Sequence, residues 1–261
     1  MNIRANLILL FYFFLKRRYI IDIKGGNILK VPGPKLILPN HQSQVDAQLM
    51  AVITAQYCDF VPIVSERIVR IPVIGNFLRA WNVVSVSDLQ GGNRDPEVLN
   101  KIFSKVQGAL QAQKSVILYP SGNITYGPLE KIKNKQSAYA LVSGLPEQAD
   151  VIGVRISGLW GSMWSVAWTG EKPDFGFTFA KGVFFVVANL IFLSPKRHVT
   201  IEFTDITKQA KKMALSDRKT FNNYLEDFYN VNGPEEVTYI KHFFFMPRIN
   251  RKYPEKLRKA S

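Results

Sequence analysis

Short apolar runs alternate with segments of helical spacing along most of the chain. Residues 96–113 show the clearest helical pattern, because Pro96 stands where a first turn tolerates proline and apolar side chains then recur every three or four positions. Helical spacing also predicts helices within 40–55 and 221–229. Aliphatic runs predict strands at 35–38, 60–64, 83–86, 115–119, 151–156 and 199–203. Strands separated by helices predict one α/β domain with a mixed sheet covered by helices.

Two further apolar runs differ from the strands, because basic residues follow each of them closely. The first, Leu7–Leu15, has nine residues and precedes Lys16-Arg17-Arg18. A membrane-spanning helix needs about 20 apolar residues, and a signal peptide would carry a small-residue cleavage site here. We therefore predict an N-terminal membrane-surface helix; an uncleaved anchor or a buried helix is the alternative. The second run, Val183–Leu193, is also too short to cross a bilayer and is followed by basic residues. Together the two runs predict a peripheral or monotopic protein on the cytoplasmic face of a membrane.

The charge balance narrows the classes of partner. The 261 residues include 34 Lys and Arg against 20 Asp and Glu, which gives a net charge of +14. This excess favours a polyanionic partner, namely membrane lipids, an acidic carrier, a phosphorylated substrate or a nucleic acid. No nucleic-acid motif occurs and many basic residues flank apolar runs, so nucleic acid is disfavoured. With the single Cys58 and three histidines, we predict neither a disulfide framework nor a metal site.

Candidate chemistry begins directly after the first predicted strand, where His41 and Asp46 lie five positions apart. Five steps of a helix turn through about 500°, so the two residues would not share a helix face. Ser43 can instead cap the following helix, with Asp46 at its third position and His41 on the preceding turn. The carboxylate would then accept a proton from one imidazole nitrogen and leave the other as a base. In the simpler alternative, Asp46 is only a capping residue and His41 only a loop residue.

A second candidate motif follows the strand predicted at 115–119. It is a proline-glycine turn with small polar groups, at a strand end of the kind where open sheets bind ligands. Its residues are Tyr119, Pro120, Ser121, Gly122, Asn123, Ile124 and Thr125.

Together these motifs resemble the glycerolipid acyltransferase superfamily, which includes 1-acylglycerol-3-phosphate acyltransferase. That superfamily has four sequence blocks, and similar ones occur here in the same order and spacing. They are Asn40–Asp46, residues 71–75 continuing to Asp88, Tyr119–Thr125 and residues 151–155. The chain is most similar to the acyltransferase half of the 2-acylglycerophosphoethanolamine acyltransferase and acyl-carrier-protein synthetase fusions. The resemblance covers about residues 30–205. With the apolar and basic runs, it leads us to expect a membrane-associating segment at 1–25, an acyltransferase domain at 26–235 and a basic tail at 236–261.

The resemblance implies an O-acyltransferase without a metal or cofactor. His41 would remove the proton of a lysophospholipid hydroxyl, which attacks the thioester of acyl-CoA or an acyl carrier protein, while Asp46 orients the imidazole. Backbone amides around 121–123 would stabilise the oxyanion. The substrate-binding residues implied are Asn40, Arg79, Tyr119, Pro120, Ser121, Gly122, Asn123 and Thr125.

The chain also departs from the family pattern. Ser121 replaces a glutamate that helps to hold the acceptor, and Asn123 stands where the fusions often have arginine. The family arginine of the second block falls near Asp88, which leaves Arg79 or Arg94 as phosphate ligands. For Arg155, a structural ion pair and a role in the site are both open. A catalytically impaired, lipid-binding family member is therefore the alternative to an active enzyme.

Overall fold

The computed structural model describes residues 3–70, 83–86, 96–249 and 251–258. At its centre is a seven-stranded sheet in the order β1-β7-β6-β2-β5-β3-β4. All neighbouring strands are parallel except β6 and β7, which pair antiparallel, so the expected mixed sheet is confirmed. The strands are β1 (Tyr19–Lys24), β2 (Lys35–Pro39), β3 (Phe60–Ser65), β4 (Val84–Val86), β5 (Ser115–Ile117), β6 (Asp150–Ser157) and β7 (Arg197–Asp205).

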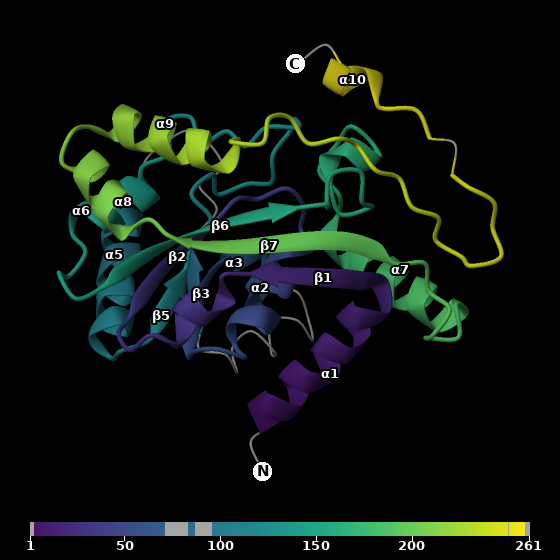
Figure 1. The fold of residues 1–261 in the computed structure, drawn as a ribbon, viewed down its shortest axis with the longest axis horizontal. Coiled ribbons are helices and arrows are strands. Elements are labelled where there is room, and N and C mark those ends of the chain that lie inside the picture. Colours follow the sequence, from purple (N-terminus) through teal and green to yellow (C-terminus); the bar gives the residue numbers. More distant parts are fainter. Residues whose placement is uncertain (1–2, 71–82, 87–95, 250, 259–261) are drawn as a thin grey trace.

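Helices cover both faces of this sheet, because successive side chains of a strand point to opposite faces. On the central strand β2, Ile37 packs into one apolar cluster while Leu36 and Leu38 pack into the other. Figure 1 shows the helices around the sheet, with the short α10 apart from it near the C-terminus. They are α1 (Ile3–Arg18), α2 (Asp46–Thr54), α3 (Glu66–Val69), α5 (Pro96–Gln111), α6 (Ser137–Ser143), α7 (Phe175–Ala188), α8 (Thr207–Ala214), α9 (Arg218–Tyr229) and α10 (Glu255–Arg258).

The two sequence motifs meet because their strands are neighbours. Strands β2 and β5 pair in parallel, with Ile37 opposite Ile117. Their carboxyl ends therefore reach the same edge of the sheet, and the chain after each strand, 40–46 and 119–125, starts from that edge. All six predicted strands are present, within about two residues of their expected ends.

Two segments at the ends of the chain are more integrated than the sequence indicated. Strand β1, at 19–24, pairs with β7 over its whole length, so the segment expected at 1–25 contributes an edge strand of the sheet. The segment expected as a basic tail also packs on the domain. The Thr238 N–H donates to the carbonyl of Trp160, and Leu257 is buried.

The apolar run at 7–15 is helical, as expected, within α1. The run at 183–193 is helical only to Ala188, because Leu190 and Ile191 adopt positive φ angles of 51° and 63° and the chain turns. Among the described residues, no helix combines the length and apolarity needed to cross a bilayer. The two helices contact each other through Phe11 and Phe179, whose ring centroids are 6.4 Å apart.

Candidate active site

His41 and Asp46 are in contact at the carboxyl edge of the sheet. The Nδ1 atom of His41 lies 2.9 Å from Oδ1 and 3.1 Å from Oδ2 of Asp46. Asp46 is fully buried, whereas 17% of the His41 side chain is exposed. Because Nδ1 faces the carboxylate, Nε2 is the ring nitrogen left for other groups. The expected contact between these side chains is thus confirmed.

The turn that brings them together differs in detail from the predicted capping box. Asp46 Oδ2 accepts a hydrogen bond from the Ser43 N–H at 3.0 Å, which is the expected acid half of the motif. The Ser43 hydroxyl, however, has no hydrogen-bond partner among the described residues. Helix α2 begins only at Asp46 and has no side-chain cap. The turn is linked to the helix by the Asp46 carboxylate and by the Asp46 N–H, which donates to the Ser43 carbonyl at 3.4 Å.

The loop after β5 holds His41 from the other side. The Tyr119 ring packs on the imidazole with 4.3 Å between ring centroids. Burial first, and then the carboxylates of Asp46 and Glu130, raise the pKa of the Tyr119 hydroxyl well above its ordinary value. The Thr125 N–H donates to the His41 carbonyl oxygen at 2.7 Å. These contacts fix both the ring and the main chain of His41.

The remaining residues of the turn divide into buried and exposed positions. Pro120 and Ser121 are buried, and the Ser121 hydroxyl donates to the carbonyl of Asn123 at 3.0 Å. Gly122 adopts a φ of 65°, which favours glycine, and its N–H donates to the carbonyl of Tyr119 at 3.0 Å. Asn123 is exposed, and the Lys172 ammonium lies 3.5 Å from its side-chain oxygen. The exposed part of the turn therefore carries Gly122 and Asn123.

Asn40 and Thr125 direct their polar groups into the protein. Both ends of the Asn40 amide are bonded to the main chain of Ile156, at 3.0 Å and 2.7 Å. The Thr125 hydroxyl bonds to the carbonyls of Gly127 and Leu129. In this structure, both side chains link the two loops to neighbouring segments.

The structure adds a residue that the sequence motifs did not indicate. Glu130 is 4% exposed, and its Oε2 accepts the N–H of His41 at 3.0 Å. Burial raises the pKa of this carboxyl to about 7, and the nearby Asp46 adds to the rise, although Ser121 and His41 partly offset it. A lone glutamate in a loop, 89 positions from His41, gives no sequence signal.

Other candidates lie elsewhere or outside the described residues. Arg79, Asp88 and Arg94 belong to segments that the structure does not describe. Arg155 on β6 pairs with Glu202 on β7 at 2.9 Å, which is the structural ion pair left open above. Within the described part of the chain, no three His, Cys, Asp or Glu side chains gather to hold a metal.

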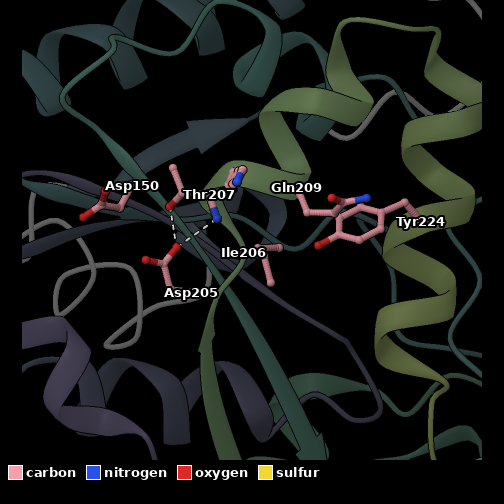
Figure 2. Close-up of a pocket in the computed structure, with 7 residues that line it drawn as sticks. Asp150, Asp205, Ile206, Thr207, Gln209 and Tyr224 are labelled. Atoms are coloured by element: carbon pink, nitrogen blue, oxygen red, sulfur yellow. Dashed lines mark hydrogen bonds between the residues drawn. The ribbon is translucent and has the colours of Figure 1, made fainter.

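A surface pocket occurs at a different place in the sheet. Asp150, Asp205 and Tyr224 contribute to its lining, and Asp205 accepts hydrogen bonds from the hydroxyl and N–H of Thr207 (Figure 2). Asp150 starts β6, opposite the first residue of β2, whereas His41 lies two residues after the last residue of β2. The pocket is therefore at the opposite edge from the His41 site.

An imidazole held by a buried carboxylate, at the ligand-binding edge of an α/β sheet, suits an enzyme that uses histidine as a general base. Residues 20–207, well over half of the chain, match the family model described as Acyltransferase, so the chain belongs to the acyltransferase family. This confirms the superfamily expected from the motifs; the resemblance to the fusion proteins stays a prediction.

Comparison with solved structures gives a consistent fold. The 1-acyl-sn-glycerophosphate (LPA) acyltransferase PlsC from Thermotoga maritima matches with a TM-score of 0.52 and 19% identity, covering 88% of this chain and 79% of that one. The same α/β architecture is therefore present in both proteins. A search of curated protein sequences gives no significant match.

Proposed function

We propose that the protein transfers an acyl chain from acyl-CoA or an acyl carrier protein to a hydroxyl of a lysophospholipid or related lipid. The observation that carries the proposal is the contact of His41 with the buried Asp46, which leaves Nε2 for an acceptor. Family membership supports acyl transfer, and the name of the similar protein from Thermotoga maritima suggests 1-acylglycerol-3-phosphate as the first acceptor to test.

The proposed reaction needs one base and no covalent enzyme intermediate. His41 Nε2 takes the proton of the acceptor hydroxyl as its oxygen attacks the thioester carbonyl carbon. The tetrahedral intermediate then collapses, the carbon–sulfur bond breaks, and the imidazolium returns the proton to the departing thiolate. Asp46 keeps Nδ1 protonated and stabilises the imidazolium. The products are the acylated lipid and a free thiol.

Oxyanion stabilisation is assigned to main-chain N–H groups of the turn after β5. The N–H of Gly122 is already engaged with Tyr119 inside this turn, so it is not the preferred donor. We assign the role to the neighbouring N–H groups of Ser121 and Asn123 instead, because fixed donors near the reacting carbon need no rearrangement during the reaction.

Cationic groups beside the turn fit anionic substrates. Lys172 approaches Asn123, and the Lys135 ammonium lies 3.9 Å from the position that a Cβ on Gly122 would occupy. Acyl-CoA, acyl carrier protein and phosphate-bearing lysolipids are all anionic, so these lysines would favour their approach. Arg79 lies outside the described residues. Among the described residues, Lys135 and Lys172 are cations that lie beside this turn, so we assign them the role in substrate approach.

Attachment to a membrane is proposed through α1, α7 and the segment 243–246. Phe243 packs edge-on against Phe185 of α7 with 5.2 Å between ring centroids, so this segment extends the helix surface. The exposed apolar side chains of the three elements are Leu9, Leu10, Phe13, Phe14, Phe177, Val183, Phe184, Val187, Phe244, Phe245 and Met246. Basic residues accompany them, with Arg17 over the ring of Phe13 and Lys181 over that of Phe177. Apolar side chains with adjacent cations suit an anionic bilayer surface, and we assign the protein to the cytoplasmic face.

Thiol release tests the proposed function. Purified protein is given palmitoyl-CoA or palmitoyl-acyl carrier protein with each of several lysolipids, and the acylated product is identified by mass spectrometry. Acceptor-dependent thiol release that disappears in His41→Ala supports the proposal. A folded wild-type protein that binds lysolipids but releases no thiol with any acceptor would instead support the impaired, lipid-binding alternative.

A further inference from the structure

Glu130 is a second buried carboxylate at the His41 turn, and the proposed reaction gives it no chemical step. Its Oε2 accepts the His41 N–H at 3.0 Å, while Asp46 contacts the ring of the same residue. The main-chain carbonyl of His41 is bound by Thr125, which belongs to the same loop as Glu130. Glu130 and Thr125 therefore hold the two polar main-chain groups of His41 from one loop.

Helix α9 fixes the position of Glu130. The Asn230 side chain, directly after α9, accepts the Glu130 N–H at 2.8 Å and donates to the Glu130 carbonyl at 2.9 Å. Glu226, which lies within α9, accepts the N–H groups of the next loop residues, Ile132 at 2.6 Å and Lys133 at 3.0 Å. The loop is thus anchored on both sides, and the Glu130 side chain is directed to His41 from a fixed main chain.

The environment is unfavourable for a carboxylate that serves packing alone. Glu130 is almost fully buried, Asp46 lies close enough to oppose its ionisation, and no basic side chain pairs with it within the described residues. An apolar side chain of similar volume would avoid this cost. The group that justifies a carboxylate here is the His41 N–H, to which an ionised acceptor gives a stronger hydrogen bond than a neutral one.

Ser121 also influences this carboxyl group. Its hydroxyl donates to the carbonyl of Asn123 and is among the groups that lower the pKa of Glu130. The second carboxyl oxygen of Glu130, Oε1, is buried and has no hydrogen-bond partner among the described residues. The hydrogen bond from His41 is therefore the contact that this carboxylate makes in the described part of the chain.

We propose that Glu130 is a positioning residue of the acyl-transfer site: its buried carboxylate holds the main chain of His41 while Asp46 holds the ring. The proposal rests on the proposed function, in which His41 is the base. Its physical content is that the His41 N–H needs an acceptor fixed at one point in space.

The test compares Glu130→Met, which keeps the volume but removes the acceptor, with Glu130→Gln. Glutamine retains a carbonyl oxygen and should keep most of the activity. In Glu130→Met, we expect kcat to fall by about tenfold or more with both KM values within about twofold of wild type.

Asp205→Ala is the matched control, because Asp205 also accepts a main-chain N–H, that of Thr207, but at the opposite edge of the sheet from His41. It should lower the unfolding temperature while leaving kcat within about twofold of wild type. Wild-type kcat in Glu130→Met, a loss of kcat in Glu130→Gln as large as in Glu130→Met, or an equal loss of kcat in Asp205→Ala would each overturn the proposal.

Hydrogen exchange separates failure of this inference from failure of the proposed function. Glu130→Met should speed exchange of the His41 N–H by about tenfold or more, while Asp205→Ala should not. Unchanged exchange at His41 overturns the positioning role whether or not the protein is active. If the wild-type protein transfers no acyl group but Glu130→Met still exchanges the His41 N–H faster than wild type, the positioning role is retained and the proposed function is rejected.

Discussion

Glu130 should make the free energy of unfolding fall as pH rises. Most carboxylates have the opposite effect, because folding usually lowers their pKa. Its pKa is raised from 4.5 to about 7 in the folded protein, chiefly by burial. Between these two values the folded state binds more protons than the unfolded state, so stability falls as pH rises through this range. Below pH 4.5 the carboxyl is protonated in both states and the effect is absent; above pH 7 it is present in full.

The size of the effect follows from the two pKa values. At about 1.4 kcal/mol for each tenfold change in proton affinity, a pKa moved from 4.5 to about 7 costs the folded protein about 3 kcal/mol above neutrality. Glu130→Gln removes the ionisation but keeps an acceptor for the His41 N–H. Relative to wild type, the variant should therefore gain about 3 kcal/mol of unfolding free energy between pH 4.5 and pH 8.5.

Urea unfolding followed by tryptophan fluorescence at several pH values measures this difference, and the buried Trp160 and Trp164 provide the signal. Asp217→Asn is the contrast, because hydrogen bonds from Thr220 lower the pKa of Asp217 at the start of α9. That variant should be less stable than wild type by an amount that stays constant over this pH range. If the wild-type and Glu130→Gln curves ran parallel from pH 4.5 to 8.5, the argument that Glu130 is held in a costly ionised state would be refuted.

Three further predictions concern catalysis, folding and membrane attachment. His41→Ala should lower kcat by about a hundredfold or more while circular dichroism stays unchanged, since it removes the base; near-normal turnover would reject the assignment. Asn40→Ala should cost about 2 kcal/mol or more in urea unfolding, because it leaves two main-chain groups of Ile156 without partners; an unchanged midpoint would contradict the structural link. Phe184→Asp with Val187→Asp should release the protein from anionic vesicles in flotation assays, whereas high salt alone should not; retention of the double variant would exclude α7 from the membrane surface.

The sheet was predictable because most of its strands are apolar enough for each to be recognised from its own sequence. Strand β2 is buried at every position, so Lys35–Leu38 stands out as a continuous run. Strand β1 was missed because it lies at the edge of the sheet and buries little beyond Tyr19, which leaves a weak apolar pattern beside the stronger run of α1. The antiparallel pairing of β6 and β7 depends on chain direction, which apolar periodicity does not encode.

The candidate site was predictable only where its residues are close in sequence. His41 and Asp46 share one turn, so their spacing alone constrained the geometry, and the contact is present. Glu130 reaches His41 through the loop after β5 and its anchoring on α9, which are tertiary features.

The position of Glu130 is physically consistent with an active site, because an active site needs its groups fixed in space. A hydrogen-bond acceptor at the His41 N–H steadies the turn only when the loop that carries it is held firmly. Here Asn230 and Glu226 hold the loop after β5, so the side chain at position 130 is directed to His41 reproducibly. Glu130 is engaged with the main chain of His41, whereas the family resemblance gives the glutamate at position 121 a role in holding the acceptor. Ser121 therefore still motivates the catalytically impaired alternative, and acceptor-dependent thiol release decides between that alternative and an active enzyme.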